Sequence, residues 1–150
     1  KAVAFGEALR PEFKTYAEQI LKNAKAMEKV LKDEGVRMIG GGTDNHLILA
    51  DVFGSLGVTG KESQTVLDEV GITLNMNSIA NDTRKPLDPS GIRFGTPAIT
   101  TRGFKEEDCA EVAKLLIETL RNKDDADKKA EIKEKVKALA HKHPIPKSFV

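Results

Sequence analysis

Tryptophan is absent from the sequence, tyrosine and cysteine occur once each, and neither sign of charge predominates. The 24 basic and 23 acidic residues leave a formal net charge of +1, which argues against a protein that binds nucleic acid by neutralising phosphates. So few large aromatic side chains also argue against a platform on which bases stack. A single cysteine cannot close an internal disulfide, which is consistent with a cytoplasmic protein.

Long apolar segments are missing as well. No run approaches the roughly 18 residues that would span a membrane, and no signal-peptide pattern is present, so we expect no membrane contact. The 150 residues suit one domain, and 39% hydrophobic with 31% charged residues exclude the disordered and collagen-like classes. The function must therefore be sought in motifs.

Apolar periodicity predicts several helices. Pro11 suits a first helical position, and a stripe with steps of three and four residues follows it until Gly35, which is a natural stop. Residues 1–9 read as another helical piece. Thr59 and Glu62 have the spacing of a capping box at the start of a short helix, and two further helices are expected between residues 106 and 142.

Short strands are predicted between these helices, at residues 36–39, 47–50, 72–75 and 92–95. The continuous apolar run at 47–50 suggests a strand buried on both faces. Strands this few and short favour antiparallel or mixed pairing over a doubly wound sheet. We therefore predict an α/β (α+β) fold, in which a short sheet is flanked by helices and residues 76–90 form a long functional or flexible loop.

The obvious motifs for chemistry carry little weight. Residues 40–43 (GGGT) could cradle a phosphate, but they lack the lysine of a P-loop, and a tight bend is the likelier interpretation. His141 and His143 lie two residues apart and would point to different helix faces, so no metal site is expected. His46 reads as a residue at a strand end, and Cys109 as a small buried hydrophobe on a helical stripe.

A lone arginine stands out in the otherwise apolar or small segment 90–97 (SGIRFGTP). Alternation places Ile92 and Phe94 on one face of the expected strand and Arg93 on the other. Its planar guanidinium suits a carboxylate, and the flanking glycines allow a close approach. The alternative is an internal salt bridge to a nearby Asp or Glu.

This segment and three others resemble serine hydroxymethyltransferase, in the order and spacing of that family. The four segments are residues 11–16 (PEFKTY), 41–47 (GGTDNHL), 74–78 (LNMNS) and 90–104 (SGIRFGTPAITTRGF). The resemblance implies the C-terminal small domain of a bacterial-type enzyme of the aspartate-aminotransferase (fold type I) class. Such enzymes use pyridoxal phosphate to interconvert serine plus tetrahydrofolate with glycine plus methylenetetrahydrofolate.

The resemblance also implies roles for individual residues. Arg93 would bind the carboxylate of the amino-acid substrate, and Asn77 would contact folate. A folate-contacting Ser-Pro-Phe step of the family aligns with Lys85, Pro86 and Leu87, where only the proline is kept. No catalytic residue and no metal site is expected in this chain.

The resemblance further implies that much of the enzyme lies elsewhere. The family's cofactor lysine stands in a Thr-Lys context, and no Thr-Lys pair occurs here. We therefore expect Lys1 to be a cut point, residues 1–34 to be a helical arm, and residues 35–150 to be the small domain without its large cofactor-binding domain. Alone, the fragment should be inactive; within the parent, a homodimer or tetramer is expected.

Two other interpretations stay open. The chain could be the small domain of a different aminotransferase-like enzyme, which would keep the arginine but would not need Asn77. It could also be a non-catalytic module that holds a carboxylate or folate.

Overall fold

Four short strands form one antiparallel sheet in the order β1-β2-β4-β3. The computed structural model describes residues 1–146, in which the strands are β1 (Arg37–Met38), β2 (Leu47–Asp51), β3 (Asn75–Asn77) and β4 (Gly91–Gly95). Every pair is antiparallel, so the α+β prediction is confirmed and the pairing is not mixed. Because β4 lies between β2 and β3, segments distant in sequence meet on its two sides.

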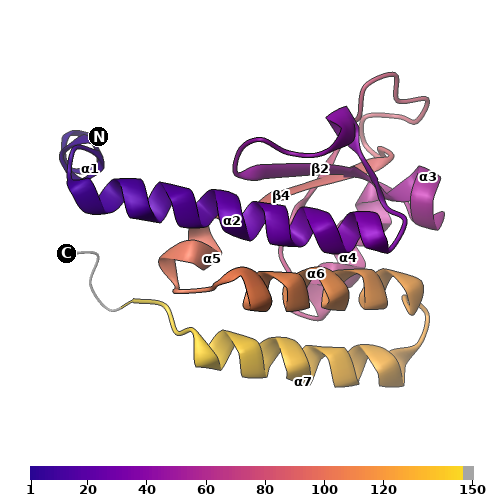
Figure 1. Cartoon of the computed structure of the whole chain (residues 1–150). Coiled ribbons are helices and arrows are strands. Elements are labelled where there is room, and N and C mark those ends of the chain that lie inside the picture. The colour runs from indigo at the N-terminus through magenta and orange to yellow at the C-terminus, as the bar shows by residue number, and fades with distance from the viewer. Residues whose placement is uncertain (147–150) are drawn as a thin grey trace.

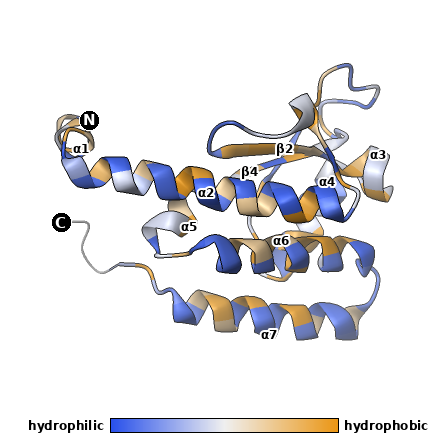
Figure 2. Cartoon of the chain, in the orientation of Figure 1, coloured by the Kyte–Doolittle hydropathy of each residue, from blue (hydrophilic) through white to orange (hydrophobic). Residues whose placement is uncertain are grey.

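The long helices cover one face of this sheet. In chain order, the helices of the described residues are α1 (Ala2–Ala8), α2 (Pro11–Asp33), α3 (Val52–Leu56), α4 (Gly60–Glu69), α5 (Pro97–Thr101), α6 (Glu106–Arg121) and α7 (Ala126–Lys142). Figure 1 shows α6 between α2 and α7, so that the three long helices form successive layers below the sheet. Figure 2 shows β2 as a largely hydrophobic strand and α7 as a mostly hydrophilic helix with apolar residues interspersed.

The core lies between the covered face of the sheet and these helices. Leu31, Leu67 and Ile92 are fully buried, and Leu116 and Leu120 of α6 are each 1% exposed. Full burial of one such side chain stabilises the fold by about 1.5–3 kcal/mol. The predicted stripe of α6 is therefore confirmed, including Cys109, which is 0% exposed.

Three strand predictions need correction. The strand expected at residues 36–39 is only Arg37–Met38, because Gly40 and Gly41 adopt positive φ values of 73° and 76° and turn the chain. The strand expected at 72–75 is displaced to Asn75–Asn77, where the chain reaches β4. The strand at 47–50 is not buried on both faces: Leu47 is 40% exposed, because helices cover only the other face.

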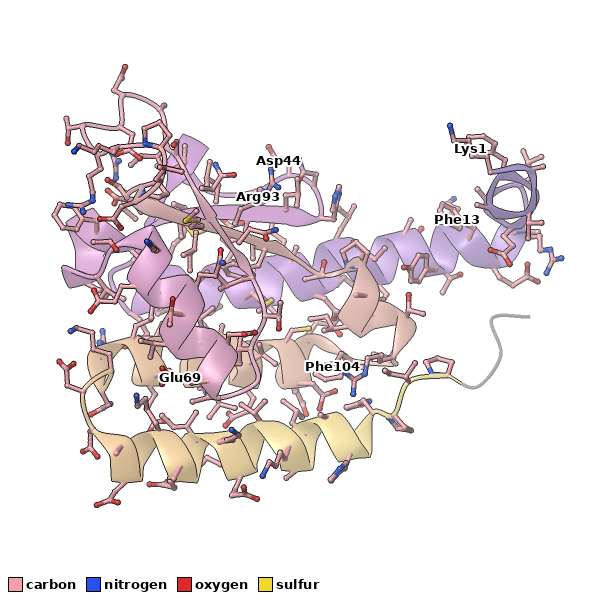
Figure 3. All side chains as sticks on the ribbon, turned by 180° about the vertical axis from the view of Figure 1, so that it is seen from behind. Lys1, Phe13, Asp44, Glu69, Arg93 and Phe104 are labelled. Carbon is pink, nitrogen blue, oxygen red and sulfur yellow. The ribbon has the colours of Figure 1, made fainter. Side chains whose placement is uncertain are left out.

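The chain begins with an arm that stands away from the sheet. Helix α1 has no buried residue, and α2 continues from it after Arg10. Figure 3 labels Lys1 and Phe13 on this arm, far from the end of the molecule that carries Glu69. Within residues 1–146, every helix is too short or too polar to cross a membrane.

Candidate functional site

Arg93 lies at the centre of β4, on the sheet face opposite to the core. Its register partners are Leu49 on β2 and Asn75 on β3. Ile92 is fully buried beneath it, while Arg93 itself is exposed, as the alternation predicts. Figure 3 shows Arg93 on the sheet, apart from Phe104 near α7. The three residues Leu49, Arg93 and Asn75 therefore form one row across the open face.

Glycines border Arg93 on its own strand. A Cβ at Gly91 would lie 2.5 Å from Ile79 Cγ2 and 2.8 Å from the Asn77 carbonyl oxygen. A Cβ at Gly95 would lie 2.7 Å from the His46 carbonyl oxygen. Both positions are thus too crowded for any side chain, and Arg93 is the only residue of β4 that presents one on this face.

The guanidinium of Arg93 makes no hydrogen bond or ion pair with residues 1–146, so the internal salt bridge considered above does not form there. The carboxylate of Asp51 lies on the same sheet face, but its Oδ2 accepts a hydrogen bond from Arg37 Nε at 3.1 Å and its Oδ1 accepts one from Gly54 N–H at 2.8 Å. Arg93 is therefore available for an external anion.

Two asparagines of β3 share this face. Asn75 is exposed opposite Arg93, and Asn77 stands opposite Gly91. Asn77 Nδ2 donates to the Ser78 carbonyl oxygen at 2.6 Å, and the amide oxygen makes no hydrogen bond with the described residues. Diagonal neighbours on adjacent strands lie about 7–8 Å apart at their backbones. The fold thus brings Asn77 and Arg93 together.

The loop between β3 and β4 covers one part of the open face and leaves the rest free. Ile79 packs over Gly91, and a hollow beneath the loop is bordered by Arg37, Asp51 and Phe53. The row that contains Arg93 is left uncovered. Lys85, Pro86 and Leu87 lie at the exposed tip, with Leu87 78% exposed, and within residues 1–146 no hydrogen bond or ion pair of their side chains joins them to Arg93 or Asn77.

The base of this loop is held by a residue that sequence reasoning missed. Asp82 accepts hydrogen bonds from Ser90 N–H at 3.0 Å and Ser90 Oγ at 2.7 Å, and from the N–H groups of Arg84 at 3.0 Å and Ile79 at 3.2 Å. The Ser90 bonds, then the Arg84 amide, hold the pKa of Asp82 well below its usual range. The sequence feature that could have indicated this role is the Asn81-Asp82 step in a turn-rich segment, because such steps favour local hydrogen bonds to the backbone.

The glycine-rich turn at residues 40–43 is closed by a carboxylate of the protein itself. Thr43 N–H donates to Glu28 Oε2 at 3.0 Å, and a Cβ at Gly42 would lie 2.4 Å from Glu28 Oε1. A carboxylate therefore already accepts from the backbone of this turn, and its negative charge would repel a phosphate. The turn is the tight bend that the sequence favoured.

An apolar cavity of about 310 Å³ lies on the covered side of the sheet, away from Arg93. It is bordered by side chains of the sheet, α5, α6 and α7, among them Phe94, Phe104 and Leu139. Arg102 at its edge is engaged, since its guanidinium donates to the carbonyl oxygens of Ala140 at 2.8 Å and His143 at 2.7 Å. Arg102 is therefore not available to an anion in this cavity.

Together, the fold and the open face define a small α+β domain whose sheet presents Arg93 and two asparagines beside a structured loop. A family model described as serine hydroxymethyltransferase matches residues 1–116, more than half of the chain. The chain therefore belongs to the serine hydroxymethyltransferase family. The match ends within α6, before α7 begins.

Proposed function

We propose that this chain is the C-terminal small domain of a bacterial-type serine hydroxymethyltransferase, which interconverts serine plus tetrahydrofolate with glycine plus methylenetetrahydrofolate. One observation carries the proposal: Arg93 is exposed between two crowded glycines and has no anionic partner within residues 1–146. A guanidinium placed in this way is suited to a carboxylate that comes from outside the domain.

Arg93 would bind the carboxylate of serine or glycine through two parallel N–H···O bonds. Its strand is held on both sides by β2 and β3, so the guanidinium is anchored to a rigid element and not to a loop. A substrate held at its carboxylate has a restricted orientation, and such positioning can supply several kcal/mol of a reaction barrier. Arg93 is thus proposed as a binding and orienting group.

Asn77 would contact folate, because its amide oxygen is unengaged by the described residues and its strand lies beside that of Arg93. An amide offers both a donor and an acceptor, which suits the mixed edge of a pterin ring. Lys85, Pro86 and Leu87 are proposed to extend this contact from the exposed loop tip. Pro86 alone keeps the family's residue there, so side-chain contacts of the neighbouring positions would differ from those of the family.

Pyridoxal phosphate would supply the electron sink for the reaction when it is bound to the complete enzyme. The described residues of this chain do not fit its phosphate, since the glycine-rich turn is closed by Glu28. We propose that a large domain provides the cofactor site, that residues 1–34 connect to it as an arm, and that residues 35–150 form the small domain. The complete enzyme would be a homodimer or a tetramer.

Arginine variants of the complete enzyme test the proposal. Arg93→Ala should raise the KM for serine by on the order of 100-fold, because two charge-assisted hydrogen bonds are lost. Arg93→Lys should rescue little, since an ammonium cannot form the bidentate pair. Arg121→Ala is the matched control, because Arg121 pairs with Glu34 at 2.6 Å. An unchanged KM for serine in Arg93→Ala would refute the carboxylate role.

The asparagine separates this proposal from the small domain of another aminotransferase-type enzyme. Asn77→Ala should raise the KM for tetrahydrofolate and leave binding of glycine nearly unchanged. Asn77 is a diagonal neighbour of Arg93 on the adjacent strand, so its removal leaves the guanidinium in place. If folate dependence is unaltered in Asn77→Ala, the aminotransferase alternative is favoured. Binding of folate or glycine without turnover in the complete protein would favour a non-catalytic module.

A further inference from the structure

The loop between Asn77 and Gly91 is organised around a single carboxylate. Asp82 is the shared acceptor for backbone N–H groups of Ile79, Arg84 and Ser90 and for the Ser90 hydroxyl. Each oxygen accepts two of these four bonds. In the described residues no cation pairs with this carboxylate, since the side chain of Arg84 is bonded to Asp88 instead. The group therefore acts as a hydrogen-bond hub.

The donors stand at both ends of the loop. Ile79 follows Asn77 by two residues, and Ser90 immediately precedes Gly91, the first residue of β4. Asp82 thus ties the end of β3 to the start of the strand that carries Arg93. The side chain of Ile79 lies over Gly91, so the same closure is reinforced by packing.

The base of the loop is also attached to the helices. Gly60 N–H donates to the Pro89 carbonyl oxygen at 2.7 Å, and Phe53 N–H donates to that of Ser90 at 3.0 Å. The Arg84 guanidinium stacks on the Phe53 ring, 4.4 Å from its centre. The loop therefore has a fixed base and an exposed tip, and Asp82 is the group within the base that contacts both of its ends.

We propose that Asp82 is a positioning residue of the site: it holds Asn77 and the loop base against the strand of Arg93, so that the amide and the guanidinium keep a constant separation. This inference rests on the proposed function. Loss of the hub should therefore weaken the substrate contacts of the Asn77 amide and of the Arg93 guanidinium, although both side chains are still present.

Asp82→Asn in the complete enzyme tests this inference. The amide keeps the shape of the side chain but turns one acceptor into a donor that faces backbone N–H groups, so part of the hub is lost. We expect the KM values for serine and tetrahydrofolate both to rise about tenfold, with kcat changed less. Melting temperature is measured in parallel, because some stability will also be lost.

Asp108→Asn is the matched control. Asp108 is likewise a hub, accepting from Lys142 Nζ at 2.7 Å and from Lys105 N–H at 3.1 Å, but it lies at the start of α6 on the covered side. Its variant should lose stability without a change in either KM. If both variants leave the KM values unchanged, or both raise them alike, Asp82 has only a structural role.

Ser90→Ala is a milder test that stands even if Asp82→Asn does not fold. It deletes only the hydroxyl bond and keeps the Ser90 N–H bond to Asp82. We expect both KM values to rise about threefold, and unchanged values would overturn the inference. The Arg93→Ala result is independent of these outcomes: it can refute the proposed function while the Asp82 variants test only positioning.

Discussion

Glu28 shows how one buried side chain shapes the chain before β2. Burial alone raises the pKa of this carboxyl, but hydrogen bonds from Lys32, from Thr43 N–H and from Lys25 outweigh it and lower the pKa to about 2. The charged form is therefore the one that the fold stabilises. It closes the glycine-rich turn and fixes the approach to β2.

This pKa gives the stability a pH dependence of known sign. Because the folded pKa lies below the ordinary value of 4.5, the stabilisation is complete above that value and is lost as the pH falls through it toward 2. Asp108, whose pKa is also lowered to about 2, adds to the same trend. The melting temperature should thus stay level from about pH 7 to about pH 5 and fall below it.

Glu28→Gln should remove part of this decline. The variant is expected to be less stable near neutral pH by about 1–3 kcal/mol and to approach the parent at low pH. Glu111→Gln, at an exposed position of α6, is the control. Equal pH profiles for Glu28→Gln and the parent, from thermal unfolding, would show that Glu28 does not contribute.

At the scale of elements, the start of α4 is packed directly on the strand of Arg93. Gly60 is the first residue of α4, and a Cβ there would lie 2.2 Å from the Gly91 carbonyl oxygen. The preceding residue, Thr59, caps the helix by accepting from Glu62 N–H at 3.2 Å. Helix and strand can approach this closely only because position 60 has no side chain.

Gly60→Ala should therefore destabilise the fold by about 2–3 kcal/mol, because the added methyl group meets backbone that cannot rotate away. Gly6→Ala is the matched control: no atom lies within 4 Å of a Cβ there, and alanine favours the helix. Urea unfolding measures both. A midpoint for Gly60→Ala equal to that of the parent would contradict the close contact.

At the scale of the whole molecule, the sheet separates two environments. The covered face is apolar and is extended by α6 and α7, although the family match ends before α7. Arg102 and the Lys142–Asp108 ion pair, with its nitrogen and oxygen 2.7 Å apart, join α7 to the elements before it. The open face carries Arg93. The apolar core and the exposed Arg93 thus lie on opposite sides of the same four strands.

If the cofactor site lies in another domain, as proposed, the chain should be inert alone. It contains no Thr-Lys pair, and its glycine-rich turn holds Glu28. We expect the purified chain to show no serine cleavage and no visible absorption band of bound cofactor after addition of pyridoxal phosphate. Either signal would contradict the assignment of the cofactor site to another domain.

The class of fold, the long helices and the face of Arg93 could all be predicted from the sequence alone. These follow from short-range rules: apolar periodicity marks α2 and α6, and alternation sets Arg93 opposite Ile92. Its motifs also indicated the family. The roles of Arg93, Asn77 and residues 85–87 stay predictions.

The surroundings of Arg93 could not be predicted in this way, because they depend on the tertiary structure. The displaced β3, the one-sided burial of β2, and α3 and α5, which the periodicity did not predict, depend on which strands pair and which face the helices cover. The Glu28 carboxylate lies within the glycine-rich turn because the chain returns to α2 after β1. The bonds of Asp82 are local, and they depend on the path that the loop takes between β3 and β4. A pattern of neighbouring residues does not encode such distances, because long-range contacts are set by packing of the whole core.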